Sequence, residues 1–151
     1  MELQAAFKQA VEALAQSAPW ALRAMGEALT GRELLVCVDN EQLAVRAPDG
    51  TLEWGAPGAT ANVHARAKRR GLAALLDGEV TLEGALLDGS LDVRGKIEHV
   101  LGALDAQQAF ARGALRCPEL ITLGDEFLGR AGGLEDSWTG AREGAEQGKE
   151  R

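Results

Sequence analysis

Apolar and polar residues alternate strictly from Ala59 to Lys68, and this alternation is the feature that most constrains the fold. Every second residue from Ala61 to Ala67 is small or apolar, and the residues between them are polar or charged. Successive side chains of a strand point to opposite faces, so the segment predicts a strand with one buried face and one face in water. The fold must therefore contain a sheet that is covered on one side.

Helical spacing precedes this strand in the sequence. Over residues 1–16, large apolar residues recur every three or four positions, which predicts an amphipathic helix. These residues are Leu3, Phe7, Val11 and Leu14. A second helix is expected to follow, with Ser17 as its N-cap and Pro19 in its first turn.

Short apolar runs rich in β-branched residues predict the other strands. Turn residues separate the runs, including Asp39-Asn40 and Pro48-Asp49-Gly50, and such residues favour hairpins. The predicted strands cover residues 33–38, 42–47, 51–54, 59–68 and 90–94. Together with the helices, they predict an α+β fold with a mostly antiparallel sheet of about five strands and helices on one face.

Helical patterns return after the alternating strand. Two short helices are expected in the related segments Ala74–Gly78 and Ala85–Gly89, each stopped by its glycine, and Thr81 can cap the second. A longer helix from Lys96 to about Arg112 is expected to bury Ile97, Val100, Leu101 and Leu104, and Pro118 opens a last helix. We expect one domain over residues 1–128 and a loose, glycine-rich and charged tail over 129–151.

Charge and composition argue against several classes of partner. The 151 residues carry 16 Lys and Arg against 23 Asp and Glu, a formal net charge of -7, and only 4% are aromatic. A nucleic-acid-binding protein needs positive charge and usually aromatic side chains. No uncharged run approaches the roughly 20 residues of a membrane-spanning helix, and the N-terminus lacks the basic region of a signal peptide. We therefore expect a cytoplasmic protein that binds no nucleic acid.

No pattern typical of an enzyme or a metal site occurs in the sequence. It contains no G-x-S-x-G elbow, Walker loop or G-x-G-x-x-G segment. His64 and His99 have no second His or Cys at the spacing of metal ligands. Cys37 and Cys117 are expected to be reduced, buried thiols. The sequence therefore predicts no catalytic residue, no metal and no cofactor.

One basic cluster stands out, at the end of the alternating strand and the start of the next helix. It consists of Arg66, Lys68, Arg69 and Arg70. The simpler interpretation is a solvated helix edge. The functional interpretation is a peripheral contact with anionic lipid headgroups or an acidic partner, where each cation contributes about 1 kcal/mol.

Residues 72–104 carry a series of landmarks in a distinctive order. They are Leu75, Gly78-Glu79-Val80, Ala85-Leu86, Gly89, Leu91-x-Val93 and Gly95. This block resembles the core of the sterol carrier protein type 2 (SCP-2) domain, the sterol- and lipid-binding fold. Leu86, Ser90 and Lys96 depart from the family pattern, which often has an aromatic, a basic and an acidic residue there. The resemblance implies non-catalytic binding or transfer of a lipid, sterol or isoprenoid.

The expected site is an apolar cavity between the sheet and the helices. Its predicted lining is Leu75, Leu76, Leu86, Leu87, Ile97, Val100, Leu101 and Leu104. Burial of apolar surface is enough to hold a lipid tail there, although the same residues could instead fill a solid core. The alternative functions are an accessory or scaffold protein that acts with a lipid-metabolism enzyme, and a small enzyme that uses His64 or His99. A protein partner or a second copy of the chain is compatible with the first two.

Overall fold

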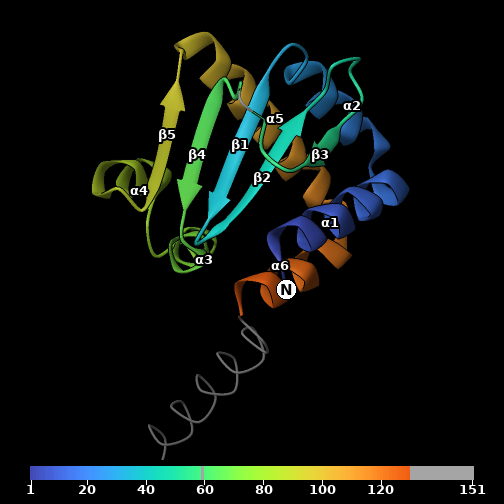
Figure 1. Cartoon of the computed structure of the whole chain (residues 1–151). Coiled ribbons are helices and arrows are strands. Elements are labelled where there is room, and N and C mark those ends of the chain that lie inside the picture. Colours follow the sequence, from blue (N-terminus) through green and yellow to red (C-terminus); the bar gives the residue numbers. More distant parts are fainter. Residues whose placement is uncertain (59, 130–151) are drawn as a thin grey trace, which may run out of the picture.

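The protein folds into a single sheet with helices packed against one of its faces (Figure 1). The structure is a computed structural model that describes residues 1–58 and 60–129. In chain order the elements are α1 (Leu3–Ser17), α2 (Pro19–Ala28), β1 (Glu33–Val38), β2 (Glu41–Arg46), β3 (Glu53–Gly55), β4 (Val63–Ala67), α3 (Arg69–Leu76), α4 (Leu82–Asp88), β5 (Leu91–Gly95), α5 (Ile97–Ala114) and α6 (Pro118–Leu128).

The sheet has five strands in the order β3-β2-β1-β4-β5. β1 pairs antiparallel with β2 and parallel with β4, and the outer pairs β2–β3 and β4–β5 are antiparallel. Figure 1 shows α5 crossing behind the sheet. The predicted α+β class and the mostly antiparallel five-stranded sheet are confirmed.

The junction between the first two helices differs from the prediction. Ser17 is the last residue of α1, and Ala18 alone connects it to Pro19, the first residue of α2. The backbone N–H of Ala18 donates to the carbonyl of Leu14. The prediction that Ser17 caps α2 is therefore wrong, because α1 extends through Ser17 and the N-cap position of α2 falls on Ala18, which has no capping side chain.

The predicted ends of α4 are confirmed. Thr81 precedes the helix, and its hydroxyl oxygen accepts a hydrogen bond of 3.0 Å from the backbone N–H of Gly84. Gly89 ends the helix with φ 82°, in the left-handed region that glycine adopts without steric cost. These caps fix where the chain turns from α4 into β5.

The hydrophobic core lies between the sheet and helices α1, α2, α5 and α6. Its side chains come from the inner face of β1 and β2 and from the facing sides of these helices. The largest fully buried side chains are those of Leu14, Leu29, Leu43, Val63 and Cys117. The C-terminal limit of the described fold is α6, which ends with Gly129 at φ 73°. The predicted tail, beyond Gly129, lies outside the described residues.

The buried face of α5 is made of small residues. They are Gly102, Ala106, Ala109 and Gly113. α5 packs against α2, and a Cβ added to Gly113 would lie 2.6 Å from the Cβ of Ala21, so glycine is what lets the two helices approach. The prediction that α5 buries Ile97, Leu101 and Leu104 is wrong, because the opposite, smaller face makes this close contact.

Candidate functional site

Exposed apolar side chains gather on the two helices that flank β5. Leu87 on α4 is 89% exposed and Ile97 at the start of α5 is 73% exposed. Both helices contact β5. We call the whole set the apolar surface, and it comprises Leu82, Leu86, Leu87, Ile97, Leu101 and Leu104.

The spacing of these residues gives each helix one apolar stripe. Ile97, Leu101 and Leu104 recur at i, i+4 and i+7 on α5, and Leu82 and Leu86 are four residues apart on α4. These residues therefore form two ordered stripes rather than scattered exposed positions.

The sheet beneath this surface is only partly covered. Leu91 and Val93 of β5 lie opposite Ala67 and Ala65 of β4, and Ala65 in turn lies opposite Val36, which packs against the core. Residues that are opposite one another in a ladder share a face, so Leu91 and Val93 point to the helical side. Both are half-buried.

The residues predicted to line a cavity fall into three groups. Leu86, Leu87, Ile97, Leu101 and Leu104 belong to the apolar surface, and Leu75 and Val100 are half-buried. The side chain of Leu76 lies outside what the structure describes. The cavity itself stays a prediction, and the structure describes open apolar stripes where it was expected.

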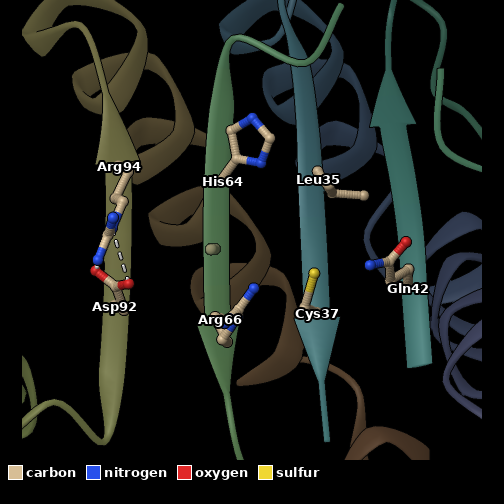
Figure 2. Close-up of a pocket in the computed structure, with 8 residues that line it drawn as sticks. Leu35, Cys37, Gln42, His64, Arg66, Asp92 and Arg94 are labelled. Atoms are coloured by element: carbon tan, nitrogen blue, oxygen red, sulfur yellow. Dashed lines mark hydrogen bonds and ion pairs between the residues drawn. The ribbon is translucent and has the colours of Figure 1, made fainter. Parts of the chain in front are cut away.

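The opposite face of the sheet carries a polar hollow of about 370 Å³. Figure 2 shows that its labelled side chains come from β1, β2, β4 and β5. It is lined by Leu35, Cys37, Gln42, His64, Ala65, Arg66, Asp92 and Arg94. Within it, the Nε of Arg94 donates to the two carboxylate oxygens of Asp92 at 3.0 and 3.3 Å.

His64 and His99 have different environments. His64 is exposed on β4, in the polar hollow. The Nδ1 of His99 accepts a hydrogen bond of 3.2 Å from the Nε of Arg32, and the same guanidinium donates to the carbonyl of Ala28 at the end of α2. His99 thus helps to hold α5 against the end of α2. Among residues 1–58 and 60–129, no group of three or more His, Cys, Asp or Glu could hold a metal ion.

Arg69 of the basic cluster is a structural residue. Its guanidinium forms ion pairs with Asp39 and Glu41, donates to the carbonyl of Met1 and lies 4.4 Å from the ring centre of Phe127. This corrects the prediction that all four basic residues are available to a membrane or partner. The three that remain exposed are Arg66, Lys68 and Arg70.

Both cysteines are free and buried, as predicted from the sequence. The Sγ of Cys117 lies 3.0 Å from the Oε2 of Glu119, to which it donates. Burial, and then this hydrogen bond, raise the pKa of the Cys117 thiol. A buried thiol with a raised pKa is a poor nucleophile, and Cys117 packs within the hydrophobic core.

Comparison with known proteins gives likenesses in structure. No family model and no curated protein matches this sequence. A solved structure of "UbiJ-SCP2 Ubiquinone synthesis protein" is similar, with 25% identity over 59% of this chain and 76% of that chain and a TM-score of 0.44. The sterol carrier protein domain 2 of Helicoverpa armigera is similar too, with 18% identity over 58% of this chain and 75% of that chain and a TM-score of 0.44.

A third similar structure is that of an enzyme. The alkylsulfatase Pisa1 from Pseudomonas sp. shares 15% identity over 57% of this chain and 14% of that chain, with a TM-score of 0.40. Further sterol carrier protein 2 structures are similar as well. Sterol carrier protein 2 recurs in the names of these similar structures. A function for this chain has to come from its own surfaces.

Proposed function

We propose that the protein binds or transfers a lipid, sterol or isoprenoid on the apolar surface that flanks β5, without catalysing a reaction. The observation that supports this is the exposure of two ordered apolar stripes beside a partly covered sheet. Monomeric proteins rarely leave large contiguous apolar patches in water, and those that do usually bind something there.

Burial on this surface is sufficient for such a ligand. Each methylene group of a lipid tail that leaves water contributes about 0.8 kcal/mol, so a chain of several methylenes binds without any polar contact. Leu91 and Val93 on the inner face of β5 would form the floor under the tail.

No catalytic group is needed for this role, and the reduced, cytoplasmic setting predicted from the sequence is part of the proposal. Within residues 1–58 and 60–129, no helix is long and apolar enough to cross a membrane.

The accessory function is the second candidate. The name of one similar structure refers to ubiquinone synthesis, which is a property of that protein. For this chain, the same exposed leucines could be covered by a partner protein. Native mass spectrometry of the freshly purified full chain separates the two functions, because bound lipid and a bound protein add different masses.

A matched pair of variants tests the site directly. Leu86→Ser combined with Leu101→Ser removes one side chain from each stripe, and Leu115→Ser combined with Ile121→Ser removes two equally large, exposed side chains from α6 and the end of α5. We expect the first variant to weaken binding of a fluorescent fatty acid or sterol analogue about tenfold or more, a loss of about 1.4 kcal/mol, and the control to leave it within twofold. Equal affinities in both variants, or no uptake by the unmodified protein, would overturn the proposal.

A further inference from the structure

β5 is an edge strand whose outer side pairs with no other strand of the described sheet. It stands at one end of the order β3-β2-β1-β4-β5 and has five residues, whereas the opposite edge, β3, has three. Figure 1 shows β5 at this edge, with α4 beside its N-terminal end. An edge strand presents unpaired backbone N–H and C=O groups that can pair with another strand.

The charges on β5 are arranged so that the strand complements itself. Asp92 and Arg94 point to the same face, two residues apart, on either side of Val93. If two copies pair antiparallel through β5 with Val93 at the centre, Asp92 of each copy lies opposite Arg94 of the other. Opposite charges in directly facing positions stabilise a strand pair.

These two side chains are available for such pairing. The side chain of Arg94 is 79% exposed and that of Asp92 is 42% exposed. In the single chain these two side chains form an ion pair with each other, two residues apart on the same strand. An exposed ion pair of this kind contributes little by itself. Exchange of partners between two copies would therefore lose little and would gain two cross-strand pairs.

The ends of β5 carry the two most exposed residues of the apolar surface. Leu87 precedes the strand and Ile97 follows it. An antiparallel pairing centred on Val93 brings the start of one β5 beside the end of the other. Leu87 of each copy and Ile97 of its counterpart then stand at the same end of the strand pair.

We propose that a second copy of this chain pairs through β5, so that the two sheets join into one across a two-fold axis at Val93. Such an interface is isologous, because the same residues face one another from both copies. The axis gives each charged pair twice. The proposal is argued from the free edge and the charges of β5, and its test does not require that the protein binds lipid.

Reversing the charge at Arg94, and then exchanging the charges of Asp92 and Arg94, tests this interface. Arg94→Asp places like charges opposite one another twice, and the double variant Asp92→Arg with Arg94→Asp restores opposite pairs in the reversed sense. We expect a two-chain mass for the unmodified protein in light scattering coupled to gel filtration at about 100 µM, a concentration that populates any dimer of lower Kd. The single variant should weaken the dimer about tenfold or more, and the double variant should restore it.

Lys8→Asp is the control, since it makes the same change in net charge at an exposed position on α1. It should leave the dimer unchanged. A one-chain mass for the unmodified protein would overturn the proposal. So would a dimer that survives Arg94→Asp, or one that the double variant does not restore while its thermal unfolding matches that of the unmodified protein. The readout is mass rather than lipid uptake, so this proposal and the lipid proposal can fail separately.

Discussion

The helices that cover one face of the sheet pack differently over its two halves. Over β1 and β2, helices α1, α2, α6 and the C-terminal part of α5 form a close-packed half. Over β4 and β5, helices α3, α4 and the N-terminal part of α5 form an open half. Small residues are buried where the helices of the close-packed half meet, whereas in the open half the large apolar residues of α4 and of one stripe of α5 stay exposed. The comparison shows that in this protein small residues decide which helix faces meet, because they allow the backbones to approach.

The largest expected difference between the halves is in the cost of replacing one leucine in each of them by alanine. Leu14 on α1 is fully buried in the close-packed half, and Leu14→Ala should lower the free energy of unfolding by about 2–5 kcal/mol. Leu101→Ala, in the open half, should change it by about 0.5 kcal/mol or less, since the residue is already 53% exposed. Chemical denaturation measures both values. Similar losses at the two positions would contradict the division into two halves.

Glycine positions sharpen the same comparison. A Cβ on Gly26 of α2 would lie 1.9 Å from the carbonyl oxygen of Gly50, a backbone atom that cannot rotate away. Gly26→Ala should therefore cost about 1–3 kcal/mol in unfolding free energy.

Gly124 on α6 is the matched control for that substitution. No atom of residues 1–58 and 60–129 lies within 4 Å of the position where its Cβ would be, so Gly124→Ala should stabilise the protein by up to about 1 kcal/mol, the difference in helix propensity. Thermal unfolding of the two variants should move in opposite directions. A stable Gly26→Ala protein would show that α2 and the turn at Gly50 are less tightly packed than described.

The smallest expected effect lies at the junction of α4 and β5, at the margin of the open half. The side-chain and backbone hydrogen bonds from Ser90 lower the pKa of Asp88. A lowered pKa in the folded state contributes stability above the ordinary pKa of the carboxyl, and that contribution is lost as the pH falls. Ser90→Ala removes one of the two bonds and should raise the pKa of Asp88 towards its ordinary value in an NMR titration. An unchanged pKa would show that the hydroxyl is not bound to Asp88 in solution.

Local signals account for what the sequence predicted well. The alternation around His64, the turn residues and the caps at Thr81 and Gly89 each depend on near neighbours in the chain, so strands, helix ends and the α+β class follow from them. The buried face of α5 does not, because periodicity gives weight to Ile97 and Leu101 and almost none to glycine. Which face packs is decided by α2, which lies far away in the sequence.

The sequence predicted a cavity lined by leucines around β5, and that cavity stays a prediction. Whether those leucines are buried depends on how far the neighbouring helices reach over the sheet, which local sequence patterns do not reveal. The role of Arg69 could not be predicted from local patterns either, because Glu41 and Phe127 lie far before and far after it in the sequence. The polar hollow could have been predicted from the sequence. His64 and Arg66 on one strand, and Asp92 and Arg94 on another, alternate with apolar residues and therefore lie on the face of the sheet opposite the core.

The parallel pairing of β1 and β4 joins strands that are far apart in the sequence, with Leu34 opposite Val63. The hairpin of β1 and β2 closes over two residues. The pairing of β1 with β4, in contrast, requires the chain to close a long loop before any stabilising contact forms. Pairings of that kind slow folding. We therefore expect formation of the β1–β4 pairing to limit how fast the two halves of the sheet join.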